Sequence, residues 1–223
     1  MKSTLEILDT TLTSPSDLID NGISGFNNRT ISFSNIKDLA IDYKIITHNR
    51  IESTRMTLRE PMVRDVDCLF RIYSDTRTNI FNPAGPMRSR ADADVIMERW
   101  LSSWTEHGFG MWAIGLTGES DRVIGFGGLS YASFGTETKV NLGYRFAPEV
   151  WGQGFATELA SIAVNHGLQG LNLEEIFAKV RPNHDASRKV LEKAGLTEYG
   201  LLDDVSDAPP SIVYRIARRG RMP

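Results

Sequence analysis

Two glycines and an alanine gather in one short stretch that could hold a negatively charged group. Residues 149–160 read EVWGQGFATELA, and the strand-like segment KVNLGYRF, residues 139–146, comes shortly before them. Backbone N–H groups are unpaired where a helix begins, and the helix dipole makes that end mildly positive. Gly152 and Gly154 would leave those amides open to a pyrophosphate, and Ala156 keeps the first turn slim.

The glycine pattern alone does not identify an activity, because short Gly-x-Gly turns also occur for purely structural reasons. No Gly-Lys-Ser/Thr follows the glycines, which excludes a P-loop nucleotide site. Thr157 stands where the dinucleotide-binding pattern Gly-x-Gly-x-x-Gly needs its last glycine. At this point a structural turn and a phosphate-binding loop are equally open.

The segments around this stretch predict an α/β (α+β) protein with a mixed, mostly antiparallel sheet. Apolar alternation predicts strands at TRMTLRE (54–60), MWAIGLT (111–117), RVIGFGGLSY (122–131), KVNLGYRF (139–146), LEEIFAKVR (173–181) and SIVYRIA (211–217). Helical spacing predicts helices within 65–75, with Asp65 as a cap, and within 89–108, 156–168 and 183–195. This order places a strand-helix-strand crossover at the centre of the sheet.

Composition sets the class of protein and excludes several partners. The chain has 25 basic and 28 acidic residues and a net charge of −3, so we expect no nucleic-acid and no membrane partner. Cys68 is the single cysteine, which excludes an internal disulfide and a cysteine-based zinc cluster. No histidine pair has metal-ligand spacing, so we expect no metal. The N-terminal segment has no apolar run typical of a signal peptide, and we expect a cytoplasmic protein.

The chain changes character near residue 50. Residues 1–50 are rich in Ser, Thr and Asn, and we interpret them as an N-terminal appendage that the folded domain, residues 51–223, does not need. Within the appendage, the segment IKDLAIDYKII, residues 36–46, could form either a short helix or a strand.

Four motifs in a fixed order carry a family resemblance. TRMTLRE, then GFGMWAIGL with VIGFGGLS, then NLGYRFAPEVWGQGFATE, and finally VRPNHDASRKVLEKAGL are similar to the GCN5-related N-acetyltransferase (GNAT) superfamily. The nearest match is the branch that acetylates ribosomal-protein N-termini and small amines. The resemblance covers about residues 53–217 and implies acetyl-CoA as co-substrate. It also implies splayed central strands, KVNLGYRF and EEIFAKVR, with the pantetheine arm lying between them.

The resemblance assigns cofactor-binding roles by position. It implies that Tyr144, Arg145 and Phe146 face the arm, and that the pyrophosphate is cradled by Trp151, Gly152, Gln153, Gly154, Phe155, Ala156 and Thr157. Trp151 stands where many relatives carry Gln or Arg, so phosphate binding would depend mostly on amides. Asn183 and Ser187 match family residues beside the arm near the sulfur, and we take both as cofactor-binding and catalytic candidates. The alternative is that Asn183 or Asp185 caps a helix and Ser187 fills its first turn.

The sequence departs from the family pattern at two positions. Leu191 stands where many members carry a tyrosine that protonates the leaving thiolate, so Ser187 or a water becomes the candidate acid. Asn141 stands where relatives in this branch often carry Glu, and we take it as a substrate-binding candidate. The general base is unassigned, with weak candidates Glu137, Glu149 and His184. Trp104 is most simply a core residue, although its family position beside the acceptor pocket makes substrate contact the alternative.

We therefore expect an N-acetyltransferase that moves an acetyl group from acetyl-CoA to a primary amine by direct transfer. The acceptor would be a protein N-terminus or a small-molecule amine, and the enzyme a monomer or a homodimer. The alternative is a non-catalytic acyl-CoA-binding sensor or interaction protein. In that alternative the missing tyrosine and glutamate reflect lost chemistry, and residues 1–50 supply a partner surface.

Overall fold

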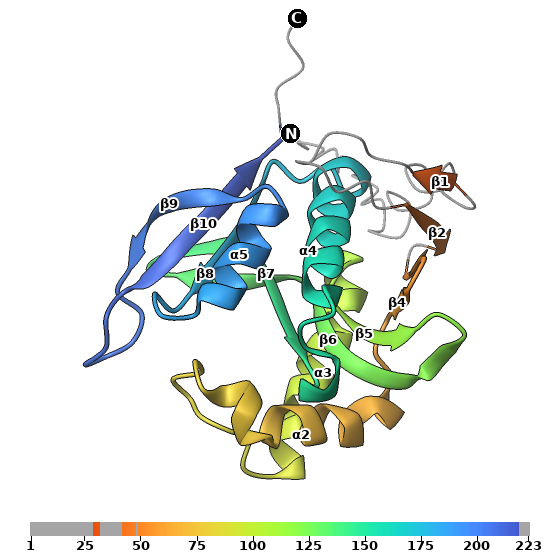
Figure 1. Ribbon diagram of the computed structural model, residues 1–223, viewed down its shortest axis with the longest axis horizontal. Helices are drawn as coiled ribbons and strands as arrows, with labels where there is room; N and C mark the ends of the chain where they lie inside the picture. The colour runs from red at the N-terminus through yellow and green to blue at the C-terminus, as the bar shows by residue number, and fades with distance from the viewer. Residues whose placement is uncertain (1–28, 32–41, 48, 219–223) are drawn as a thin grey trace, which may run out of the picture.

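The computed structural model describes residues 29–31, 42–47 and 49–218, and their strands form one sheet. The strands are β1 (Arg29–Ile31), β2 (Tyr43–Thr47), β3 (Arg50–Ser53), β4 (Met56–Arg59), β5 (Met111–Leu116), β6 (Glu119–Phe134), β7 (Glu137–Phe146), β8 (Glu175–Val180), β9 (Thr197–Leu202) and β10 (Ser211–Ala217). Their order across the sheet is β1-β2-β3-β4-β5-β6-β7-β8-β10-β9, which runs from right to left in Figure 1. Neighbours are antiparallel except β7 and β8, which are parallel. The mixed, mostly antiparallel sheet predicted from the sequence is confirmed.

The helices lie on both faces of this sheet. They are α2 (Val66–Ser74), α3 (Arg90–His107), α4 (Phe155–Asn165) and α5 (Asp185–Lys193), with short helical turns η1 (Val63–Asp65), η2 (Thr76–Asn79), η3 (Pro148–Val150) and η4 (His166–Gly170). Local sequence explains the ends of α3, because the Ser89 side chain accepts a hydrogen bond from the Asp92 amide and Gly108 ends the helix with a left-handed φ of 70°.

The two main clusters of the core among the described residues lie on opposite faces of the sheet, because alternate residues of a strand point to opposite faces. On one face, Phe126 of β6 packs with Leu69 of α2 and Met97 of α3. On the other face, Leu159 of α4 and Leu191 of α5 belong to a larger cluster that includes residues of β4, β5 and β8. The sheet is therefore covered by α2 and α3 on one side and by α4 and α5 on the other (Figure 1).

The sheet extends across the boundary predicted at residue 50. β3 pairs with both β2 and β4, and the side chains of Tyr43, Ile45 and Ile51 are buried in the larger core cluster. Of the segment whose structure the sequence left open, residues 43–46 lie in β2, while residues 36–41 lie outside the described residues. The dispensable appendage stays a prediction, but the strands just before residue 51 share the core of the domain.

Two local features differ from the sequence expectation. β9 was not predicted, because it is an edge strand whose residues are mostly exposed on both faces and show no apolar alternation. Asp65 precedes α2 as expected, but its carboxylate does not cap that helix. It accepts hydrogen bonds from the Arg59 guanidinium at 2.7 and 2.8 Å instead, and both partners are buried. A buried cation is a stronger competitor for a carboxylate than a helix amide.

Candidate active site

β7 and β8 separate from each other at the centre of the sheet. They pair at a single register position, Asn141 opposite Phe177. β7 stays paired with β6 along its whole length, so residues 142–146 have one edge hydrogen-bonded and the other edge facing the gap toward β8. Backbone groups on such an edge need partners, and an extended amide-bearing chain can supply them. The predicted splay of the central strands is confirmed, and we call this gap the β7–β8 opening.

Residues 151–157, which the sequence predicts to hold a pyrophosphate and which we call the phosphate loop, lie at the wide end of the opening and lead into α4. Gly152 and Gly154 adopt left-handed φ angles of 75° and 82°, which other residues adopt only with strain. A Cβ atom at Gly152 would meet no atom within 4 Å, so the backbone angle and not internal crowding requires the glycine there. The amide of Glu158 donates to Gly154 O at 3.1 Å. The amides before it are those that an α-helix leaves without intrahelical acceptors, and they suit an anion.

An arginine from the β3–β4 turn holds the phosphate loop in place. Arg55 Nη1 donates to the Gln153 carbonyl at 2.8 Å, and its Nε donates to the Glu158 carboxylate at 2.7 Å. Glu158 is buried in the first turn of α4, where its charge complements the helix dipole. Its other carboxylate oxygen accepts from Ser53 Oγ at 2.6 Å. Sequence analysis missed this cluster, because Arg55 and Glu158 are 103 positions apart and neither lies in a recognisable motif with the other.

The aromatic side chains around the loop make contacts within the protein. Trp151 is 48% exposed, and its indole donates to the Phe146 carbonyl at 2.9 Å, which joins the loop to the end of β7. The rings of Phe146 and Phe155 are buried and stacked at a centroid distance of 6.5 Å. Any contact of Phe146 or Phe155 with a bound arm would therefore come from the backbone. The cofactor-binding roles of Phe146 and Phe155 stay predictions, and they concern backbone contacts alone.

Ser187 of α5 is paired with a tyrosine of β7 on the face of the sheet that α5 covers. The Tyr144 hydroxyl of β7 lies 2.9 Å from Ser187 Oγ in the first turn of α5, and burial raises the pKa of Tyr144. α5 is preceded by His184, which makes no side-chain cap, while Asn183 is exposed. The capping alternative for Asn183 therefore has no support in the geometry. Leu191, at the family's tyrosine position, is buried in the core.

Arg145 and Asn141 lie on the opposite face of β7 from Tyr144. Arg145 Nη1 donates to Asn79 Oδ1 of η2 at 2.8 Å, and the guanidinium lies 4.2 Å from the centre of the Tyr73 ring. Its side chain therefore points away from α4 and α5, and only its backbone borders the opening. Burial lowers the pKa of Arg145. Asn141 Oδ1 is buried and has no hydrogen-bond partner within the described residues.

The three candidate bases have different surroundings. Glu137 pairs with Lys139 at 2.7 Å at the end of β7 away from the opening, and Glu149 is exposed and contacts Arg77 at 3.3 Å. His184 stacks on Phe81 at a centroid distance of 4.0 Å, and burial lowers the pKa of its imidazole. Its Nδ1 is buried without a partner in the part of the chain that the structure describes. Of the three, His184 alone combines burial that favours the uncharged form with a ring nitrogen that has no partner among the described residues.

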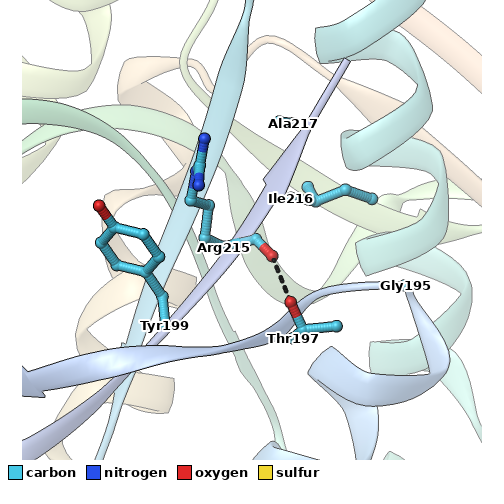
Figure 2. Close-up of a pocket in the computed structure, with 6 residues that line it drawn as sticks. All are labelled: Gly195, Thr197, Tyr199, Arg215, Ile216 and Ala217. Carbon is cyan, nitrogen blue, oxygen red and sulfur yellow. Dashed lines mark hydrogen bonds between the residues drawn. The ribbon is translucent and has the colours of Figure 1, made fainter. Parts of the chain in front are cut away.

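Trp104 lies in the core, and the hollow between β9 and β10 lies away from the predicted site residues. Trp104 is 5% exposed and donates from Nε1 to the Met111 carbonyl at 3.0 Å, which favours its core role over substrate contact. A shallow hollow lies at the other end of the sheet, between β9 and β10, and is lined by Gly195, Thr197, Tyr199, Arg215, Ile216 and Ala217 (Figure 2). It contains none of the predicted site residues. Within the described ranges no three His, Cys, Asp or Glu side chains could hold a metal ion, and no helix is long and apolar enough to cross a membrane.

Comparisons with known proteins agree with this geometry. The chain is 28% identical to an uncharacterized N-acetyltransferase, p20, of Bacillus licheniformis over 159 residues, which cover 71% of this chain and 88% of the relative. Among solved structures, it is similar to Mycobacterium smegmatis RimJ in complex with CoA-disulfide, at 25% identity and a TM-score of 0.60 over 73% of this chain and 81% of that one.

The same fold occurs in a Vibrio cholerae spermidine N-acetyltransferase in complex with CoA and spermine, at 18% identity and a TM-score of 0.58 over 73% of this chain and 95% of that one. The family model described as "Acetyltransferase (GNAT) domain" matches residues 55–197, which is more than half of the chain. The chain therefore belongs to the GNAT acetyltransferase family.

Proposed function

We propose that this protein transfers an acetyl group from acetyl-CoA directly to a primary amine. The observation that carries the proposal is the β7–β8 opening, whose wide end leads into the glycine-containing phosphate loop at the start of α4. An extended arm that adds to the free edge of β7 and ends in a pyrophosphate fits both features. The CoA complexes of the two related structures support this use of the fold.

The wide and narrow ends of the β7–β8 opening set the direction in which the co-substrate would lie. With the pyrophosphate at residues 151–157, the arm runs along residues 146 to 142 toward the narrow end, where Asn141 pairs with Phe177. The thioester would then be delivered between Asn141 on one face of β7 and Ser187 on the other. The phosphate loop is already held by Arg55 and Trp151, so little ordering is needed on binding.

The chemistry needs few groups from the protein. The amine nitrogen bonds to the acetyl carbon as the carbon–sulfur bond breaks, one proton leaves the nitrogen, and one proton reaches the sulfur. Burial lowers the pKa of His184, which favours its uncharged form, and the imidazole could accept the amine proton, directly or through a water. The Ser187 hydroxyl could donate a hydrogen bond to the departing sulfur, with Tyr144 fixing its orientation.

Amine-dependent release of thiol from acetyl-CoA tests the proposal. We expect thiol release with at least one of a panel of peptide N-termini and small amines, together with acetyl-CoA binding measured by calorimetry. Binding without release for any amine would favour the non-catalytic acyl-CoA sensor. Absence of binding would overturn both functions, because both need the β7–β8 opening to hold the arm.

A further inference from the structure

Arg145 is a partly buried cation with no carboxylate partner. No ion pair of the described residues includes it, and Asp75 and Glu149, at the start of η2 and within η3, are both engaged by Arg77. Its contacts are the neutral Asn79 amide and the face of Tyr73. Charges removed from water are normally compensated by an opposite charge. Arg145 is therefore able to bind an anion.

The geometry of the guanidinium shows which edge is available. Nη1 is used by Asn79, and the Tyr73 ring covers one face of the planar group. The Nε and Nη2 atoms have no partner within the described ranges and are not sealed from solvent. These two nitrogens form the side of the fork that binds a carboxylate through two parallel hydrogen bonds.

A second polar group without a hydrogen-bond partner among the described residues lies on the same face of β7. Asn141 and Arg145 are four residues apart in one strand, so both side chains leave the same side of the sheet. Gly143 lies between them and has no side chain, and Asn141 Nδ2 lies 3.5 Å from the position that a Cβ would take there. The buried Asn141 Oδ1 can accept a hydrogen bond from an amine. Four residues of a strand span about 13 Å, so the two groups are on the order of 10 Å apart at their tips.

We propose that the acceptor carries a carboxylate about 10 Å from its reacting amine, with the amine at Asn141 and the carboxylate at Arg145. A free amino acid is too short for this, because its amine and carboxylate are on neighbouring atoms. A peptide N-terminus with an acidic side chain at its third residue has the required length. A polyamine would instead bring a second cation to Arg145, which disfavours it. This inference rests on the proposed acetyl transfer at the same site.

The test compares two tripeptide amides, Ala-Ala-Glu and Ala-Ala-Gln, which differ only in the charge of the third side chain. We expect kcat/KM to be about tenfold higher for the Glu peptide, as for one charge-assisted hydrogen-bonded contact. Arg145→Met should remove this preference, and Arg145→Lys should keep part of it. Arg64→Met, which deletes an equal charge at an exposed pair with Asp121, should leave the preference as it is in the wild type.

Calorimetry of the two peptides with the protein–CoA complex makes the test independent of turnover. Tighter binding of the Glu peptide, lost in Arg145→Met, would support the inference even if no acetyl transfer occurred and the proposed function failed. Equal kcat/KM and equal affinity for the two peptides in the wild type would overturn the inference and leave the proposed function intact. Arg145→Met that weakens CoA itself while the Glu preference persists would also overturn it, because Arg145 would then serve the phosphates.

Discussion

Gly154→Ala should weaken CoA binding through the backbone of the phosphate loop. Gly154 has a φ of 82°, and an added Cβ would lie 3.6 Å from Arg55 Nη2, which is an ordinary contact and not a clash. The cost is therefore the left-handed conformation, about 1–2 kcal/mol for a residue with a side chain. If the free loop relaxes to relieve this strain, binding must restore it, and the Kd for CoA rises by roughly 5- to 30-fold.

Gly118→Ala is the matched control, because Gly118 lies in the β5–β6 turn with a φ of 86° and open space around its Cβ position. Gly118→Ala should lose stability in urea unfolding and keep the wild-type Kd, whereas Gly154→Ala, whose loop relaxes in the free protein, should lose less stability and show a weaker Kd in calorimetry. An unchanged Kd in a Gly154→Ala variant that also keeps wild-type stability would refute the assignment of the phosphate loop. Equal weakening in both variants would show a general loss of structure instead.

Three further predictions concern the pair on α5, a buried histidine and the N-terminal strands. Tyr144→Phe and Ser187→Ala should each lower kcat by about tenfold with little change in CoA affinity, because each removes support for a hydrogen bond to the departing sulfur; single-turnover rates equal to wild type would reduce Ser187 to a helix residue. Burial lowers the pKa of His166 from 6.5 to about 4, so between these pH values the unfolded chain binds a proton that the folded chain excludes. The free energy of unfolding should fall by about 3 kcal/mol as pH decreases through this range, and urea unfolding of His166→Leu should show a smaller fall. If the pH dependence of His166→Leu equalled that of the wild type, the lowered pKa of His166 would not be its cause. A chain starting at Asp42 should fold, whereas one starting at Glu52 loses three core side chains that are at most 4% exposed, worth roughly 5 kcal/mol or more; equal melting temperatures would show that β2 and β3 are dispensable.

Strong local patterns explain which parts of the fold could be predicted. α3 has both a serine cap and a terminal glycine in its sequence, and β4 through β8 show apolar runs between turns. β9 has no such pattern because it is an exposed edge strand. β2 and β3 are no shorter than the predicted strand β4, but their burial depends on core residues contributed by strands and helices much later in the chain. Sequence periodicity is therefore informative only where the apolar pattern of an element matches the face that it buries.

The sequence by itself determined the family motifs, the glycines of the phosphate loop and the order of the central elements, because these depend on neighbouring residues. Only the tertiary structure decided what the site side chains contact: Tyr144 meets Ser187 across 43 positions, Arg145 meets Asn79 across 66, and Arg55 meets Glu158 across 103. It also turned Arg145 away from α4 and α5 and left Asn141 Oδ1 without a partner. Such contacts depend on which strand faces and helix ends the folded sheet brings together, and the spacing of residues along the chain does not contain that information.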